Sequence, residues 1–284
     1  MVRRRIAKEP ISQLASWARH CALFSLAATV LVIVIVRAGW IEIDPSVAAV
    51  TGALGIAGLS ILLALAALVV IWREGIDGLG RALVAIIIGV GLLTYPAFLG
   101  VKYVRTPAIA DVTTDMTDPP KFDQIAKLPR GTSTYPGPAV AARQRAAYPD
   151  IEPLQIATTA QLAYEAAISV VTKRKWLVIN NRPPQAGRRD GQIEAIARTP
   201  ILGFREDIVV RVRGSADGAR VDVRSASRYG HHDLGSNAAR VRSLLEDIDD
   251  TAATLVEERN KKTQAKPPSG KAPPAKAPPQ PAKR

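Results

Sequence analysis

The first third of the chain contains three long apolar runs that carry no Asp, Glu, Lys, Arg or His. They occupy residues 21–36, 47–72 and 82–101. A helix of about 20 apolar residues spans the hydrocarbon core of a bilayer, so the second and third runs predict transmembrane helices. The first run is shorter, but Trp17 and Trp40 flank it, and tryptophan favours the membrane–water interface. We therefore predict three transmembrane helices within residues 21–101.

Basic residues are distributed unevenly around these runs. Residues 1–20 carry five Lys and Arg against one Glu, and the loop after the second run holds Arg73 and Arg81, whereas the loop after the first holds Arg37 alone. Because cytoplasmic loops are enriched in Lys and Arg, residues 1–20 are predicted to be cytoplasmic and the C-terminal domain periplasmic, at a bacterial inner membrane. A cleaved signal peptide is the alternative for the first run, and it leaves the domain on the same side.

The composition of the runs favours an anchor over a transporter, because they lack the ionisable residues that mark ion and proton pathways. Small residues at helical spacing predict close helix packing, within one chain or between copies. These residues are Gly52, Gly55, Gly58, Gly89 and Gly91. The single cysteine, Cys21, lies in the first run and cannot form an internal disulfide or a zinc cluster.

Beyond the membrane, residues 102–153 are rich in Pro, Thr, Asp and Gly without a sustained period, which predicts an extended, turn-filled segment. A helix is expected over 160–174, with Thr158 or Thr159 as its cap. Four β-prone runs follow, at 175–181, 191–202, 206–214 and 219–227, and the last two are joined by a tight turn at Asp217 and Gly218. Apolar residues at helical spacing predict a final helix over 237–258.

This order of helix, roughly four strands and helix predicts the fold class. Strands joined by short turns pair antiparallel, and a one-sided sheet needs its apolar face covered. We predict an α+β domain at 154–260 in which both helices pack on one face of an antiparallel sheet. Residues 261–284 hold seven prolines, seven basic residues and no acid, which predicts a disordered basic tail.

The net charge of +13 first suggests a nucleic-acid partner, but the charge lies at the two ends of the chain. Residues 105–260 carry a net charge of only +2. A groove for DNA or RNA needs its excess charge on a folded face, so nucleic acid is not an expected partner.

Residues 224–250 concentrate side chains that can do chemistry. A metal site would use His231, His232 and Asp233, but adjacent residues on a strand point to opposite faces and no further His or Cys pair completes the set. A hydrolase would activate Ser225 or Ser227 with one of the histidines, although no G-x-S-x-G elbow surrounds either serine. We expect no metal and no cofactor.

Two further interpretations of the same run stay open. In the structural one, Asp233, Ser236 or Asn237 caps the last helix and Gly235 permits a turn. In the other, the free amides of a helix N-terminus and converging arginines bind an anion or a lipid head group. The residues predicted for this anion site are Arg224, Arg228, Asn237 and Arg240, with the outer strand face of Arg211, Arg213 and Arg220 extending it.

The same residues carry a family resemblance. The stretches DVTTDMTDPP, IEAIARTPILGFREDIVVRVR and VDVRSASRYGHHDLGSNAARVRSLL resemble the bacterial and plastid family catalogued as domain of unknown function 1499, over residues 105–250. Gly203, Phe204 and Asp207 match it as well. The most specific element is the run R-S-x-S-R-x-G-x-x-D-L-G-x-N. It is formed here by Arg224, Ser225, Ser227, Arg228, Gly230, Asp233, Leu234, Gly235 and Asn237.

The resemblance implies no activity, cofactor or catalytic residue. The family motif does not require histidine at positions 231 and 232, which weighs against the metal and hydrolase interpretations. Ser225, Ser227, Gly230, Asp233 and Gly235 are expected to be structural parts of the motif. We expect a non-enzymatic binding or envelope-maintenance module whose partners are the bilayer and an anionic lipid or a membrane protein. The alternative is a serine-dependent hydrolase that acts on an envelope substrate.

Overall fold

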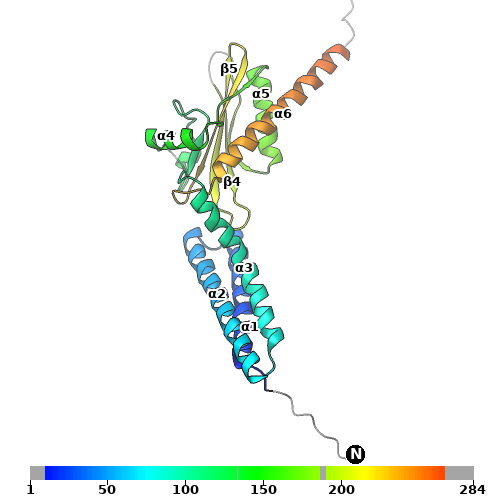
Figure 1. The fold of residues 1–284 in the computed structure, drawn as a ribbon. Coiled ribbons are helices and arrows are strands. Elements are labelled where there is room, and N and C mark those ends of the chain that lie inside the picture. The colour runs from blue at the N-terminus through cyan, green and yellow to red at the C-terminus, as the bar shows by residue number, and fades with distance from the viewer. Residues whose placement is uncertain (1–9, 133, 186–189, 266–284) are drawn as a thin grey trace, which may run out of the picture.

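A computed structural model describes residues 10–132, 134–185 and 190–265. Three long helices come first: α1 (Gln13–Arg37), α2 (Ile43–Glu74) and α3 (Leu79–Arg105). They pack against one another as a bundle, and the remaining elements form a second body beyond the end of α3 (Figure 1). All three are long and apolar enough to cross a membrane, so the prediction of three N-terminal apolar spans is confirmed.

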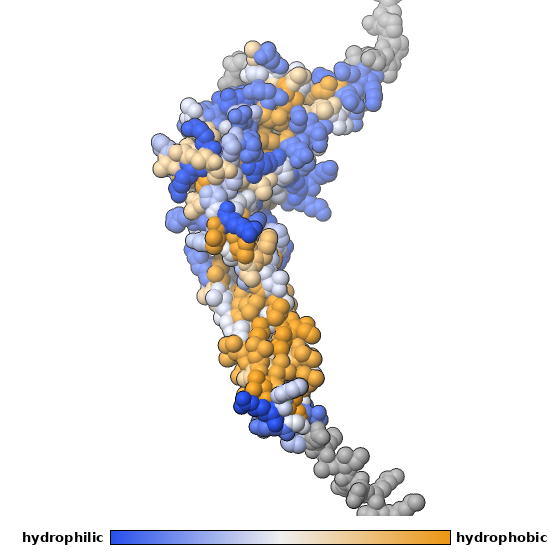
Figure 2. Space-filling model, viewed as in Figure 1, coloured by the Kyte–Doolittle hydropathy of each residue, from blue (hydrophilic) through white to orange (hydrophobic). Residues whose placement is uncertain are grey.

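The surface of the bundle is apolar along most of its length (Figure 2). Nearly all of the exposed large hydrophobic side chains of the described residues belong to α1–α3 or to the loop between α1 and α2. Where the helices meet, the buried side chains are small, as at Ala18, Ala64 and Ala85. Small residues inside and large apolar residues outside suit a hydrocarbon solvent. The chain is therefore a membrane protein.

One of the glycines predicted to allow close packing does so within the chain. A Cβ on Gly89 would lie 2.6 Å from Ile61 Cγ1 and 3.1 Å from the Ala57 carbonyl oxygen, so only glycine lets α3 approach α2 this closely. A Cβ would meet nothing within 4 Å at the other four positions, Gly52, Gly55, Gly58 and Gly91. Of the two kinds of packing predicted for these glycines, packing within the chain is therefore seen at Gly89, and packing between copies stays a prediction for the other four.

The second body is built on one antiparallel sheet of six strands in the order β1-β6-β5-β4-β3, with β2 also paired to β6. The strands are β1 (Asp111–Thr113), β2 (Leu154–Ile156), β3 (Leu177–Arg182), β4 (Gly191–Arg198), β5 (Arg205–Ser215) and β6 (Gly218–Ser227). The helices are α4 (Pro138–Ala147), α5 (Ala160–Lys173) and α6 (Ser236–Ala265), with a 3₁₀ turn at Ile125–Lys127. The fold is α+β, as predicted.

The additional strands and α4 correct the expectation for residues 102–153. That segment was predicted to be extended, but it contributes β1, the 3₁₀ turn and α4 to the folded body. Gln144 of α4 shows why these elements are stable. Its Oε1 accepts a hydrogen bond from the Thr113 amide at 3.1 Å, and its Nε2 donates to the Thr113 carbonyl at 2.6 Å, so one side chain completes the edge of β1.

Helices α5 and α6 cover the same face of the sheet, as predicted (Figure 1). Alternation along the strands directs Ile208 and Val223 to this face, where they pack with Val170 of α5 and Leu244 of α6. The opposite face is covered by the chain between β1 and α4, through Phe122 and its neighbours.

A buried carboxylate fixes that covering segment. Glu194 on β4 is fully buried, and its oxygens accept the backbone N–H groups of Asp123, Gln124 and Ile125 at 2.8–3.1 Å. These amides begin the 3₁₀ turn, so Glu194 caps the turn from the strand beneath it.

The last helix is longer than predicted. It begins at Ser236 and continues to Ala265 instead of ending at 258, so it includes the first five residues of the predicted disordered tail. Its C-terminal end points away from the three-helix bundle (Figure 1). The remainder of the predicted tail, 266–284, lies outside the described residues.

Candidate functional site

The alternation of β6 divides the family motif between the two faces of the sheet. Ser225 bonds to Asn237 of α6 on the helix-covered face, whereas Arg224 and Arg228 bond to partners on the loop-covered face. The four residues predicted for an anion site therefore do not converge. Arg224 and Arg228 lie on one side of the sheet, and Asn237 and Arg240 lie on the other.

Arg224 is the largest fully buried side chain of the described residues, at 1% exposure. Its Nε and Nη2 donate to the two oxygens of Asp111 at 3.0 and 2.8 Å, and Nη1 donates to the Pro120 carbonyl at 3.1 Å. The guanidinium also lies 4.8 Å from the Phe122 ring centroid and 5.4 Å from that of Tyr135. Burial raises the pKa of Asp111, although the Arg224 charge opposes this shift. The guanidinium is therefore enclosed by the protein itself.

Arg228 has a similar environment at the end of β6. Its Nε donates to Asp207 Oδ1 at 2.8 Å, its Nη1 lies 3.4 Å from the Pro129 carbonyl oxygen, and its side chain is 1% exposed. Asp207 is also buried and accepts the Thr132 amide at 2.9 Å. A carboxylate thus neutralises this second arginine of the motif.

On the helix-covered face, Ser225, Asn237 and Arg240 form a buried polar cluster. Ser225 Oγ donates to Asn237 Oδ1 at 2.8 Å, and Arg240 Nη1 donates to the same oxygen at 2.6 Å and to Ser225 Oγ at 2.9 Å. Arg240 also forms an ion pair with Glu206. Burial, and then the charge of Arg174, lowers the pKa of Arg240 to about 10.

The turn between β6 and α6 uses the conformational freedom of the motif glycines. Gly230 and Gly235 both have φ of +74°, and Leu234 between them has φ of +56°. Asp233 then caps α6, because its carboxylate accepts the Gly235 amide at 2.8 Å and the Asn237 amide at 2.6 Å. Burial raises the pKa of Asp233, and these amide hydrogen bonds partly oppose the shift. The structural role expected for Gly230, Asp233 and Gly235 fits this geometry.

The same turn contacts the end of α3 and the residues that follow it. The ring of His232 stacks on Tyr103 with centroids 4.5 Å apart, and its Nε2 lies 3.0 Å from the Thr106 carbonyl oxygen. Asp233 donates its amide to the Ile109 carbonyl at 3.2 Å. A Cβ on Gly235 would lie 3.3 Å from Thr106 Cγ2, so the turn packs closely on the chain as it leaves the bundle.

Two further hydrogen bonds attach the next residue, Ala110, to the motif. The Ser227 amide donates to the Ala110 carbonyl at 2.8 Å, and Asn237 Nδ2 donates to the same oxygen at 3.0 Å. The motif therefore joins the sheet, α6 and the last membrane helix. We call the group of Ser227, His232, Asp233, Gly235 and Asn237 the joint.

The contacts of these residues form neither the Ser–His pair of a hydrolase nor a metal site among the described residues. His232 Nδ1 accepts the Leu234 amide at 3.0 Å, and no hydrogen bond joins His231 or His232 to Ser225 or Ser227 within the described part of the chain. Over the same residues, no group of three or more His, Cys, Asp and Glu side chains could hold a metal ion.

The outer arginines of β5 and β6 are paired with acids. Arg211, Arg213 and Arg220 each contact both Asp115 and Asp222, at distances from 2.7 to 3.4 Å. Burial opposes ionisation of Asp115, but the amides of residues 117 and 118 and the arginine charges outweigh it and lower its pKa. Asp115 and Asp118 of the stretch DVTTDMTDPP, together with Asp222 of β6, therefore neutralise the arginine face that was predicted to extend an anion site.

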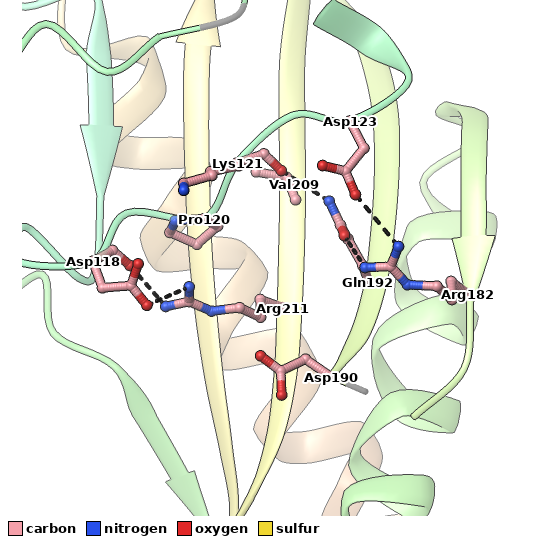
Figure 3. A pocket seen from close by; sticks show the side chains of 9 residues that line it. All are labelled: Asp118, Pro120, Lys121, Asp123, Arg182, Asp190, Gln192, Val209 and Arg211. Carbon is pink, nitrogen blue, oxygen red and sulfur yellow. Dashed lines mark hydrogen bonds and ion pairs between the residues drawn. The ribbon is translucent and has the colours of Figure 1, made fainter. Parts of the chain in front are cut away.

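A polar recess of about 260 Å³ lies on the loop-covered face, between strands β3–β5 and residues 118–123 (Figure 3). Its lining is Asp118, Pro120, Lys121, Asp123, Arg182, Asp190, Gln192, Val209 and Arg211. Three acids and three bases give it a formal charge of zero. Arg211 is held by Asp118 at 2.9 Å, and Gln192 donates to the Lys121 carbonyl at 2.8 Å. Sequence reasoning missed this recess because its residues come from four separate segments.

Two charged groups of the recess have no bonded partner among the described residues. Neither the Lys121 ammonium nor the Asp190 carboxylate makes a hydrogen bond or an ion pair with the residues that the structure describes. The recess therefore offers one donor and one acceptor beside side chains that other contacts already hold in place.

Comparison with known families gives one match. Residues 111–248 match the family model described as protein of unknown function (DUF1499). No curated protein matches the chain. The matched range begins with β1 and ends within α6, so it covers the whole sheet and the joint. The match confirms, over residues 111–248, the resemblance to this family that the R-S-x-S-R-x-G-x-x-D-L-G-x-N motif indicates.

Proposed function

We propose that this chain is a non-enzymatic binding module of the bacterial cell envelope, anchored in the inner membrane by α1–α3. Its α+β domain lies on the periplasmic side and binds a small polar molecule without net charge in the recess. Lys121 donates a hydrogen bond to this ligand, and Asp190 accepts one. A ligand with both kinds of group suits this lining, because it can satisfy the Lys121 donor and the Asp190 acceptor and adds no net charge to a recess whose charges sum to zero.

The observation that carries this proposal is that the motif side chains are occupied by structural contacts. Ser225 is fully buried between Asn237 and Arg240, and His232 is bonded to the end of α3. A serine nucleophile needs a general base within hydrogen-bond reach and a route for substrate. The hydroxyl of Ser225 bonds to Asn237 and Arg240 and to no base, and the carboxylate that Ser227 contacts at 3.3 Å, Glu206, is paired with Arg240. These contacts fit a joint that holds the domain at the membrane.

The arrangement of charges supports the proposed orientation. The loop between α1 and α2 and the α+β domain lie at one end of the bundle, and the basic loop residues Arg73 and Arg81 lie at the other (Figure 1). This grouping agrees with the positive-inside rule when residues 1–20 are cytoplasmic.

The recess is tested by ligand titration. The full chain in detergent is titrated with neutral monosaccharides and with zwitterionic amino acids, and binding is followed by native mass spectrometry. We expect binding that Lys121→Gln and Asp190→Asn each weaken by about tenfold, as for loss of one hydrogen bond to a charged group. The matched variants Lys173→Gln and Asp249→Asn remove the same charges from α5 and α6 and leave binding unchanged. Equal binding by all four variants would show that the recess is not the site.

The absence of catalysis is tested separately. A serine-directed fluorophosphonate probe should not label the full chain at Ser225 or Ser227. Labelling that Ser225→Ala or Ser227→Ala abolishes would establish the hydrolase alternative in its place. Co-purification of another membrane protein, without binding of any titrated molecule, would point instead to a structural partner.

A further inference from the structure

The β4–β5 hairpin brings two arginines directly opposite each other. Arg198 ends β4 and Arg205 begins β5, and the register pairs them across the two strands. Both side chains are exposed. Like charges on directly opposed residues destabilise a sheet, because their side chains leave the same face a short distance apart. The pair therefore lowers stability unless an anion lies between the two guanidinium groups.

The described residues supply no such anion. Arg198 and Arg205 make no ion pair or side-chain hydrogen bond with any part of the chain that the structure places. On the neighbouring strand, Arg228 continues the row, but Asp207 neutralises it. Glu206, next to Arg205 in sequence, points to the opposite face and pairs with Arg240. Two positive charges at this end of the sheet remain uncompensated.

The hairpin lies where α1 ends. Arg37, the last residue of α1, donates through Nη1 to the carbonyl oxygens of Pro200 and Ile201 in the loop that joins β4 and β5. The loop thus stands at the same level as the end of a membrane-spanning helix, at the bundle side of the domain (Figure 1).

The composition of the loop suits that position. Residues 199–204 read TPILGF, and Ile201, Leu202 and Phe204 are only half-buried. Trp40, 80% exposed, belongs to the α1–α2 loop at the same end of the bundle. Apolar loop tips flanked by basic residues are typical of segments that lie in the interface of a bilayer.

We propose that Arg198 and Arg205 bind the phosphate of an anionic phospholipid in the leaflet that surrounds the ends of α1 and α3. The planar forks of the two guanidinium groups can donate paired hydrogen bonds to phosphate oxygens, and the phosphate charge removes the repulsion between them. Ile201 and Leu202 lie at the head-group boundary. This site differs in place and ligand from the recess, so either proposal can fail without the other.

The test measures which lipid the protein retains. The full chain is extracted into detergent with an equimolar mixture of phosphatidylglycerol and phosphatidylcholine, and bound lipid is counted by native mass spectrometry. We expect the wild-type protein to retain phosphatidylglycerol in preference. In the Arg198→Gln, Arg205→Gln double variant this preference falls by roughly tenfold. The double variant Lys261→Gln, Lys262→Gln loses the same charge from the far end of α6 and keeps the preference. An unchanged preference in the arginine variant would overturn the proposal.

A second measurement guards against an effect on folding alone. In nanodiscs of phosphatidylcholine, Arg205→Gln should raise the melting temperature by a few degrees, because it removes the repulsion. In nanodiscs that contain phosphatidylglycerol this gain should disappear. A melting temperature that Arg205→Gln lowers equally in both lipids would contradict the lipid site. Inorganic phosphate that stabilises the wild-type protein as much as phosphatidylglycerol does would assign the pair to a soluble anion instead.

Discussion

Replacement of Arg224 by methionine tests the buried ion pair of the family motif most severely. Methionine keeps the apolar part of the side chain, so the main loss is the guanidinium with its two hydrogen bonds to Asp111 and one to Pro120. Removing one partner of a buried pair costs about 3–5 kcal/mol, because the other charge stays buried. The ring contacts with Phe122 and Tyr135 add to that loss.

Protonation of Asp111 limits the cost. Burial already raises the pKa of Asp111 in the wild-type protein, and the shift grows when Arg224 is absent. We therefore expect Arg224→Met to lower the free energy of unfolding by about 3 kcal/mol at pH 7. A raised pKa in the folded state means that stability is lost as the pH rises through it, so the deficit should shrink towards pH 5.

The assay is urea-dependent pulse proteolysis of the full chain in detergent, which reports the unfolding of the sheet domain. The Asp111→Leu, Arg224→Met double variant replaces both charges by apolar groups and should lie within about 1 kcal/mol of the wild-type protein. If the single variant is as stable as the wild-type protein at pH 7, Arg224 does not serve as a structural cation and is free to bind a ligand.

Three further predictions use the same assay or its equivalent for the bundle. Gly235→Ala should cost about 1–3 kcal/mol, because the left-handed backbone and the tight contact both oppose a methyl group, whereas Gly203→Ala, with a similar φ and open space, should cost less. Because the pKa of Asp115 is lowered, its carboxylate stabilises the domain above the ordinary pKa of about 3.9, and this stabilisation is lost as the pH falls through the lowered pKa. In Asp115→Asn the free energy of unfolding should therefore depend less on pH at acidic pH. Gly89→Val should destabilise the helix bundle by about 1–3 kcal/mol in a detergent melt, and Gly91→Val should not, because only the first position faces another helix.

The sequence predicted the elements in which one pattern of apolar and polar residues continues over many positions. The three helices follow from runs without charge, and β5 and β6 follow from strict alternation. The tight turn between them was also expected, but its loop residues are Ala216 and Asp217, since Ser215 pairs with Gly218. Gly218 is required for another reason. A Cβ there would lie 2.3 Å from the Ile156 carbonyl oxygen.

The short elements could not be predicted, because tertiary contacts define them. Strands β1 and β2 have three residues each, too few for a period to emerge, and both exist by pairing with β6. The partner of Arg224 lies 113 positions away in the sequence, so nothing near the arginine indicated that Asp111 neutralises it. Glu194, placed between Ile193 and Ala195 in β4, was the available signal that the second face of the sheet is also covered.

The motif also combines features that the local sequence predicts with features that only tertiary contacts define. Glycines and a capping aspartate before a helical run predicted the turn and the start of α6, since both depend on local backbone chemistry. Which arginines are free depends on distant carboxylates. The exposed arginines of the hairpin, Arg198 and Arg205, are not part of the run that drew attention in the sequence.

The most direct test of the whole account is the side of the membrane on which the domain lies. In a Cys21→Ala background, Ala139→Cys places a thiol on the exposed surface of α4 and Glu74→Cys places one at the opposite end of the bundle. A membrane-impermeant maleimide applied to spheroplasts should label Ala139→Cys at once and Glu74→Cys only after permeabilisation. The reverse pattern would place the domain in the cytoplasm and contradict the account.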